Sequence, residues 1–424
     1  MQTNILLKLK AHTLLSAIVI TIIISIIIGS LLLLHYHNNM EWAKFKSSER
    51  LQRNLQSSIN LVTGDSTKYN ITGQEQLDLF GNNEDSVLIT KVYWGVFNLA
   101  SVKSFQKNKS ISKQFFYGIA LSDTLNACLF LVDHQRPLQI SGKTKLVGDA
   151  YLPKGGIKAA GIDGKQYQGE DLVYGKVLKS DTAFPAVNDF LINLMYNNLK
   201  ITGDKSFQNE HTNKIQDSAY NSFENEIQYF FVNKANQLSF QKIKGKVVLF
   251  SDSLIEIKAG VKLEDVVVMA PEIRVADNFE GTVQLIANRV ITLGKHCILK
   301  YPSSIILLKD SVNNYQGRIE MGENSFVSGL LFANAARADK YKNSVAFKKG
   351  ASFEGTVFVH GFLQLEGMVY GTVLTDYFLY KSVVATYENS LVDAVIDRTK
   401  LSPDFISSTL IKTPGKLNII KWLK

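Results

Sequence analysis

The chain has 424 residues, of which 46% are apolar and 20% charged, with only 7 prolines. This composition is typical of a globular protein and excludes a disordered or collagen-like chain. The formal net charge is +9, but the lysines are scattered without a long basic block, which indicates a mildly basic surface and no nucleic-acid partner. Cys128 and Cys297 lack the spacing of a disulfide framework or a zinc site, so we expect two buried thiols unless the fold brings them together.

Residues 13–34 form one long apolar run, TLLSAIVITIIISIIIGSLLLL, without a charged side chain. At 1.5 Å per residue, a helix of this length crosses a hydrocarbon core of about 30 Å. A cleaved signal peptide would have a shorter apolar region and a small-residue cleavage site. The sequence therefore predicts a single-pass transmembrane helix over 13–34, in contact with the lipid bilayer and preceded by a cytoplasmic leader over 1–12.

The orientation of the helix is not decided by charge, because Lys8 and Lys10 precede it and Lys44 and Lys46 follow it. Long domains that follow such a helix translocate largely regardless of charge. We therefore expect most of the chain to be extracytoplasmic. Its richness in Ile, Lys and Asn and its lack of cysteine pairs are typical of a bacterial protein, so the membrane is expected to be the bacterial cell membrane.

The helix is predicted to continue beyond the membrane as a stalk over 35–63. Leu51, Leu55, Ile59 and Val62 form one apolar stripe at helical spacing, and no glycine or proline interrupts residues 41–62. Gly64 is a plausible stop. We expect one nearly continuous helix from about Thr13 to Thr63.

This N-terminal segment resembles type IV pilins and pseudopilins, in which a short basic leader precedes a long apolar helix that enters the soluble domain. The leader would be Lys8-Leu9-Lys10-Ala11, and the resemblance implies cleavage before His12. The family usually has an aromatic first residue and a glutamate at the fifth position, where this chain has His12 and Ser16. An ordinary signal-anchor helix explains the segment equally well.

A short pattern returns behind the anchor, with Gly or Asp at a fixed place between β-branched residues. Its copies are Phe279–Val283, Phe353–Val357 and Val369–Val373, with looser copies at Leu263–Val267, Phe326–Leu330, Val173–Leu178 and Leu146–Ala150. Short strands separated by Gly turns at a repeat below about 30 residues are typical of a β-solenoid. The repeats also resemble those of right-handed β-helix proteins and of bactofilins, which are polymer-forming scaffolds. A β-sandwich is the alternative fold.

The predicted fold class is mainly β, with a transmembrane helix followed by a β-solenoid that resembles a parallel β-helix and carries a partly helical insertion. We expect a β-rich capping region over 64–137, with strands over 87–102, 115–121 and 127–132. The first solenoid turns are expected at 138–181 and the main solenoid at 242–381. Residues 182–241 are expected to form an insertion on the flank or at one end, with a helix around Phe190–Leu199. Residues 382–424 are expected to form a C-terminal cap, helical near Asn389–Arg398.

No residue is predicted to be catalytic, to hold a cofactor or to bind a metal. The sequence contains no nucleophile elbow, phosphate loop, dinucleotide fingerprint or zincin motif. The i, i+2 pair His35 and His37 points to different helix faces, so membrane-interface anchoring explains it better than metal binding. Glu280 and Glu354 occupy equivalent places in the repeat, yet solubility alone explains one carboxylate per turn. The carboxylates weighed for carbohydrate chemistry are Asp265, Asp277, Glu280, Glu320, Glu354 and Glu366.

Three functions remain open at this point. The leading one is a membrane-anchored structural or assembly protein of the cell surface, pilus- or secretion-associated, that binds protein partners or assembles with itself. The alternatives are a membrane-tethered carbohydrate-binding adhesin, for which a glycan is the partner, and a β-helix enzyme acting on polysaccharides. An acidic cleft with aromatic platforms would favour the enzyme, and exposed aromatic rows without carboxylates would favour the adhesin.

Overall fold

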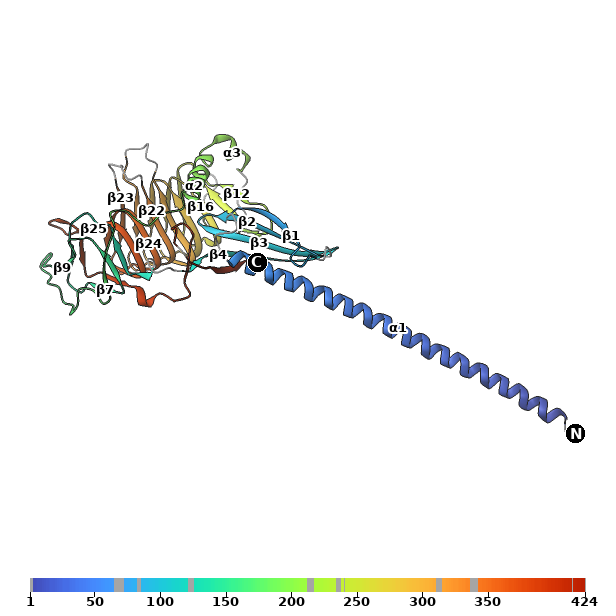
Figure 1. Cartoon of the computed structure of the whole chain (residues 1–424). Coiled ribbons are helices and arrows are strands. Elements are labelled where there is room, and N and C mark those ends of the chain that lie inside the picture. The colour runs from blue at the N-terminus through green and yellow to red at the C-terminus, as the bar shows by residue number, and fades with distance from the viewer. Residues whose placement is uncertain are drawn as a thin grey trace. The chain divides into compact units, whose positions relative to one another are not determined.

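The structure is a computed structural model of the chain (Figure 1). It describes residues 3–64, 72–81, 85–120, 126–211, 217–233, 238–239, 241–309, 315–335, 342–413 and 415–423, with only the backbone for residues 3–11. The chain divides into two compact units. The smaller comprises residues 1–59, 76–88 and 102–112, and the larger comprises 60–75, 89–101 and 113–424.

One continuous helix, α1 (Thr3–Thr63), dominates the smaller unit. Its apolar run over 13–34 presents uncharged side chains on every side, and the helix ends immediately before Gly64. This confirms the predicted continuous helix. The four residues of its predicted apolar stripe, Leu51, Leu55, Ile59 and Val62, are buried.

Parallel strands stacked turn upon turn form most of the larger unit (Figure 1). Two ladders are clearest, and both are parallel throughout. One contains β16 (Lys262–Met269), β18 (Glu280–Ala287), β20 (Ile298–Leu308), β22 (Phe326–Asn334), β24 (Ser352–Leu365) and β25 (Met368–Lys381). The other contains β15 (Leu254–Ile257), β17 (Glu272–Val275), β19 (Val290–Leu293), β21 (Arg318–Met321), β23 (Asn343–Phe347) and the end of β24. The mainly β, parallel-stranded fold class is confirmed.

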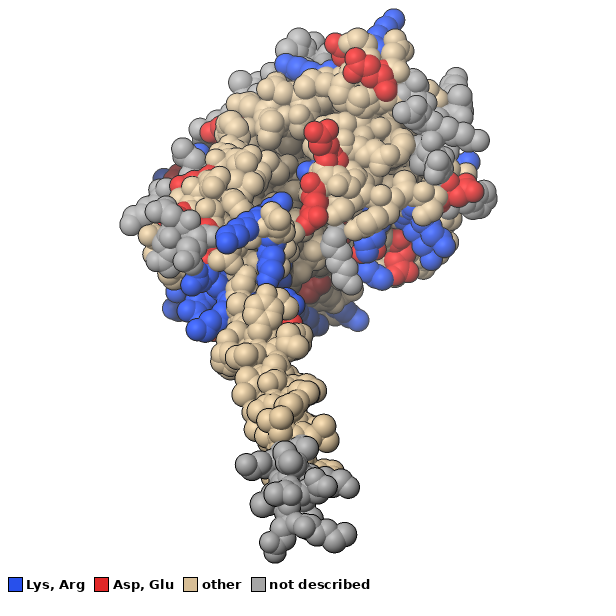
Figure 2. All heavy atoms as spheres, turned by 90° about the vertical axis from the view of Figure 1, so that its right-hand side faces the viewer, with Lys and Arg blue, Asp and Glu red and all other residues tan. Residues whose placement is uncertain are grey.

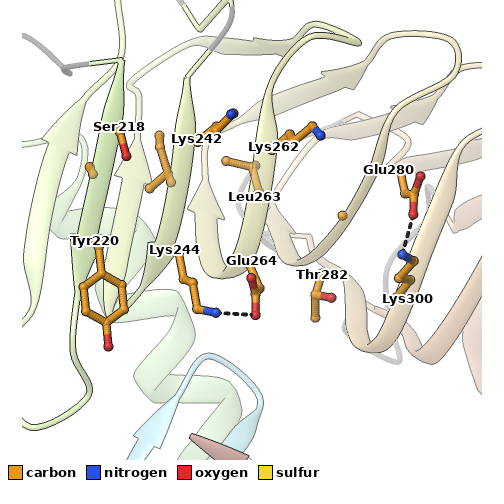
Figure 3. A pocket seen from close by; sticks show the side chains of 13 residues that line it. Ser218, Tyr220, Lys242, Lys244, Lys262, Leu263, Glu264, Glu280, Thr282 and Lys300 are labelled. Carbon is orange, nitrogen blue, oxygen red and sulfur yellow. Dashed lines mark hydrogen bonds and ion pairs between the residues drawn. The ribbon is translucent and has the colours of Figure 1, made fainter. Parts of the chain in front are cut away.

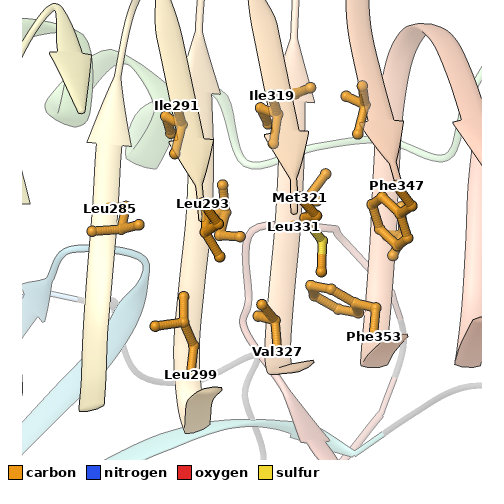
Figure 4. Close-up of a cluster of buried hydrophobic side chains, with 14 of the residues drawn as sticks. Leu285, Ile291, Leu293, Leu299, Ile319, Met321, Val327, Leu331, Phe347 and Phe353 are labelled. Atoms are coloured by element: carbon orange, nitrogen blue, oxygen red, sulfur yellow. The ribbon is translucent and has the colours of Figure 1, made fainter. Parts of the chain in front are cut away.

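The core lies between these ladders, where aliphatic and aromatic side chains of successive turns stack on one another (Figure 4). Val327, Phe353 and Val369 are paired from turn to turn and each is fully buried. A single turn could not bury these side chains alone, because each turn covers the apolar face of the next.

Glycines at one position of successive turns form a column, and this column explains why glycine recurs in the repeat. Gly329 pairs with Gly355, which pairs with Gly371, and their φ angles are +142°, +127° and +150°. A Cβ on Gly371 would lie 1.9 Å from the carbonyl oxygen of Gly355. The position therefore requires glycine both for its φ and for the close approach of the neighbouring turn. Asp265 adopts φ +62° at the register shift in β16.

The register bears out some of the sequence copies and corrects others. Val373 pairs with Leu129, Leu129 with Ala150, and Ala150 with Val177, so Leu146–Ala150 and Val173–Leu178 are in register with Val369–Leu374. The copy at Phe279–Val283 is displaced: Gly281, not Phe279, occupies the column of Phe353, through pairings with Leu299 and Val327. Glu280 and Glu354 are accordingly not equivalent. The register shifts between Gly281 and Gln284 and between Leu299 and Ser303 cancel each other, so the same displacement of two residues holds on both sides of them.

The order of stacking differs from the expected order along the chain. The predicted first turns lie beyond the last turn of the main solenoid, because β5 (Leu129–Leu131) pairs with β25 and β7 (Lys145–Val147) pairs with β28 (Val395–Asp397). The stack continues through β8 (Ala150–Leu152) to β10 (Val177–Lys179). A separate short sheet contains β27 (Ser390–Val392), β6 (Leu138–Ser141) and β9 (Ile157–Ala159). At the other end lie β11 (Ser218–Asn221) and β12 (Gln228–Phe231), which pair with β13 (Lys242–Gly245) and β14 (Val247–Phe250). Sequence similarity between turns does not determine the order in which they stack, because every turn presents the same backbone hydrogen-bonding edge to its neighbour.

A second sheet contains β1 (Gly73–Leu77), β2 (Ser86–Trp94), β3 (Phe97–Gln106), β4 (Lys109–Ala120), β29 (Ile406–Ser407) and β30 (Leu417–Leu423). Its part in the larger unit packs on the flank of the solenoid, not on an end as expected: Trp94 Nε1 donates to the Asp265 carbonyl at 3.0 Å, and Gln284 bonds both sides of the β2–β3 turn. The predicted residue Leu121 lies outside the described residues.

The insertion contains α2 (Asp189–Ile201) and α3 (Lys205–Glu210). Leu191 and Met195 share a buried cluster with Phe250 and Ile286, so α2 covers the flank, one of the two expected positions.

The C-terminal segment does not form the expected helical cap. Residues 386–397 contain the three strands β26 (Thr386–Glu388), β27 and β28, and the 3₁₀ turn Arg398–Lys400 follows them. The segment forms strands because β27 and β28 pair in parallel with other strands and bury their apolar side chains there. β29 and β30 instead pair antiparallel with β4.

Candidate functional site

The first candidate surface is the apolar part of α1. His12–Thr63 is the described helix that is long and apolar enough to cross a membrane, and its Ile and Leu side chains from Leu14 to Leu34 are exposed. In Figure 2 the described part of the helix nearest the grey residues carries no charged side chain. An exposed, uncharged helix of this length is stable in a bilayer, where the lipid chains cover its surface.

Three hydroxyl groups inside the apolar run form hydrogen bonds to the helix itself. Ser16 donates to the carbonyl of His12 at 2.9 Å, Thr21 to that of Ile18 at 2.8 Å, and Ser30 to that of Ile26 at 2.8 Å. In hydrocarbon an unpaired hydroxyl would be costly, because no water can replace the missing partner. These polar residues are therefore compatible with lipid on every side.

The stalk part of α1 has a different environment within the smaller unit. Leu51, Leu55 and Ile59 are buried, Ser47 donates to Gln106 at 2.6 Å, and Arg50 lies 3.7 Å from the buried carboxylate of Asp85. Gln106 of β3 and Asp85, which directly precedes β2, thus contact the helix from Ser47 onward. Between this part and the apolar run, the exposed aromatic residues are those expected at a membrane interface, namely Tyr36, Trp42 and Phe45.

The second candidate surface is an open groove on the outer face of the solenoid, with a volume of about 740 Å³ (Figure 3). It crosses β11, β13, β16, β18 and the start of β20, and the outward side chains of neighbouring turns line it in register. Four lysines and two glutamates provide its charge: Lys242, Lys244, Lys262, Lys300, Glu264 and Glu280.

Two ion pairs cross the groove. Lys244 Nζ lies 2.8 Å from Glu264, and this hydrogen bond raises the pKa of Lys244. Lys300 pairs with Glu280, and the hydrogen bond from Lys300 lowers the pKa of the carboxylate, with a smaller contribution from Lys262. Both pairs are solvent-exposed, so they orient side chains more than they stabilise the fold.

The six carboxylates weighed from the sequence are dispersed over different partners. Asp265 binds Lys421, Asp277 accepts from the backbone of Lys295, Glu280 binds Lys300, Glu320 lies near Lys348, Glu354 accepts from Ser328, and Glu366 accepts from Gln364. None of these contacts joins two of the six. Each of the six carboxylates therefore has a polar partner of its own.

One histidine cluster lies at a corner shared by three successive turns and was not found from the sequence. His134 Nε2 and His360 Nε2 lie 3.7 and 3.6 Å from the two carboxylate oxygens of the buried Asp376. Burial lowers the pKa of His134, and the charge of Lys342 adds to this effect, while Asp133 opposes it. The residues are far apart in the chain, so only the stacking order brings them together.

Within the described residues, no group of three or more His, Cys, Asp or Glu is arranged to hold a metal ion. Cys128 and Cys297 are buried free thiols.

These features define a class: a mainly β protein in which one long apolar N-terminal helix precedes a domain of stacked parallel strands. No protein-family model matches the sequence, and no curated protein matches it. Among solved structures, the chain is similar to a competence-associated pilin from Thermus thermophilus, with a TM-score of 0.22 and 10% identity, over 91% of this chain and 96% of that chain. A TM-score this low carries no argument about fold or function, so the proposals below depend on the geometry of this chain.

Proposed function

We propose that this protein is a membrane-anchored, extracytoplasmic structural or assembly protein of a bacterial cell envelope, with the β-solenoid as its interaction domain. The observation that carries the proposal is the exposed, uncharged surface of α1 from Leu14 to Leu34. That surface needs lipid or an equivalent apolar environment, whereas the larger unit buries most of its apolar side chains in its own core.

Membrane fractionation of two chains tests the anchor. The full chain is expected to remain with membranes after a high-salt wash, and a chain lacking residues 1–40 is expected to be soluble and folded. Residue 40 is a better boundary than residue 63, because Leu51, Leu55 and Ile59 are buried and their removal would uncover apolar surface. Solubility of the full chain without detergent would contradict the proposal.

Orientation is tested by labelling from outside the cell. Val383 is fully exposed, while both native cysteines are buried, so Val383→Cys introduces one accessible thiol. A membrane-impermeant maleimide is expected to label this variant in intact cells or spheroplasts. Labelling only after lysis would place the solenoid in the cytoplasm.

We also propose an association with pilus or secretion machinery, supported by the continuity of the apolar helix with its stalk. The test is processing by a prepilin peptidase between Ala11 and His12, read by mass spectrometry of the protein from its native host. An intact N-terminal segment would reduce α1 to a plain signal anchor. The groove on the outer face of the solenoid favours a second candidate, a carbohydrate-binding adhesin.

A further inference from the structure

The groove holds two lysines outside its two ion pairs, although the charge of Lys262 also acts on Glu280. Lys242 and Lys262 are register partners on adjacent parallel strands, both side chains are exposed, and neither forms an ion pair with a described residue. Neighbouring strands lie about 4.8 Å apart, so these like charges face each other across one step of the ladder, an arrangement that destabilises a sheet. An anion bound between them would relieve that repulsion.

The neighbouring column of the groove is suited to a sugar. Tyr220, Lys244 and Glu264 are paired in register (Figure 3), and residue Tyr220 is 57% exposed. An exposed aromatic ring beside hydrogen-bonding groups offers an apolar face with a polar rim. Glu264 and Glu280 can accept hydrogen bonds from hydroxyl groups, and Ser218 and Thr282 can donate or accept them.

We propose that this groove binds an anionic glycan, in which carboxylates contact Lys242 and Lys262, and one sugar ring packs on Tyr220. The strand spacing is comparable with the length of one sugar residue, so successive turns meet successive sugars. The groove spans four strand steps, about 19 Å at the usual spacing. A binding site of this size accommodates a short stretch of polymer.

The carboxylates of the groove distinguish a glycan from a more densely charged polymer. Glu264 and Glu280 lie beside Lys242 and Lys262 and would repel a ligand that presents only anionic groups, without hydroxyl donors, to the groove. A glycan instead supplies hydroxyl donors for these carboxylates and carboxylates for the lysines. A nucleic acid or polyphosphate lacks that alternation.

Titration calorimetry of the full chain in detergent micelles tests the proposal, with hexagalacturonate as the probe. Lys242→Gln with Lys262→Gln is expected to lower the affinity about 100-fold, since a hydrogen bond to a charged group contributes about tenfold or more. Both side chains are exposed, so the fold should persist. Lys158→Gln with Lys179→Gln removes the same charge from exposed sites on β9 and β10 and is expected to change the affinity less than about twofold.

Two further measurements separate a glycan site from a merely cationic surface. Tyr220→Ala is expected to weaken hexagalacturonate about tenfold, the loss typical of one stacked ring, and to leave the binding of hexaglutamate unchanged. Neutral maltohexaose should bind more weakly than hexagalacturonate. Hexaglutamate binding as tightly as the glycan, equal affinity in the two lysine double variants, or no binding of hexagalacturonate would each overturn the proposal. None of these results depends on the membrane assignment.

Discussion

Lys421 on β30 donates to both carboxylate oxygens of Asp265 on β16, at 2.8 and 2.7 Å, and so joins the antiparallel sheet to the flank of the solenoid. The Asp265 side chain is only 5% exposed. Replacing Lys421 by Met is expected to cost about 3–5 kcal/mol of unfolding free energy, because it leaves a buried carboxylate without its cation. Urea denaturation measures the loss. The double variant with Asp265→Asn should recover most of it, and a loss below about 0.5 kcal/mol in Lys421→Met would contradict this role of the pair.

The same pair predicts a pH dependence. Burial raises the pKa of Asp265 above its usual 3.8, and Lys421 only partly opposes this effect. The folded state therefore holds the proton more tightly than the unfolded state, and the contribution of Asp265 to stability falls as pH rises from 3.8 through the folded pKa. Without Lys421 the folded pKa should rise further. The loss of unfolding free energy in Lys421→Met is thus expected to become smaller as pH falls toward 4. Denaturation at several pH values measures this loss. A loss that does not change with pH would show that the charge of Asp265 is not its cause.

Phe353 and Glu354 are neighbours on β24 with opposite environments. Phe353 is fully buried in the stacked core, whereas Glu354 points outward and accepts a hydrogen bond from Ser328 at 2.9 Å. Phe353→Ala should cost about 3–5 kcal/mol through the cavity it leaves. Glu354→Gln keeps the size of the side chain and should cost less than about 0.5 kcal/mol. Chemical denaturation of both variants provides the comparison, and similar small losses would contradict the stacked core.

The glycine column gives a prediction that separates steric overlap from backbone strain. Gly371→Ala adds a Cβ that would overlap the Gly355 carbonyl at positive φ, and it should cost about 2–6 kcal/mol, the sum of overpacking and a strained φ. Gly156 also has positive φ, +71°, but its Cβ would have open space. Gly156→Ala should therefore cost only about 1–2 kcal/mol. Thermal unfolding of both variants tests the difference, and equal losses would show that overlap between turns contributes nothing.

The local features of the chain could be predicted from the sequence because each depends on residues close together along it. The apolar run at 13–34, the stripe from Leu51 to Val62 and the helical spacing in α2 all have a periodicity that a single segment displays. The Gly-punctuated strands likewise predicted stacked turns, and the burial of Phe353 and Val369 agrees.

Tertiary structure alone decided how those segments are ordered and what they bring together. Parallel turns present the same hydrogen-bonding edge, so nothing local placed β5 beyond β25 or set Gly281, rather than Phe279, in the column of Phe353. The Asp265–Lys421 pair and the His134–Asp376–His360 corner join residues distant in the chain, and the lysines of the groove become neighbours only through the register of β13 and β16. The sequence determined the anchor and the strand-forming repeats because their physics is local. The groove and the buried charges required the fold, because register and stacking order depend on contacts between distant segments.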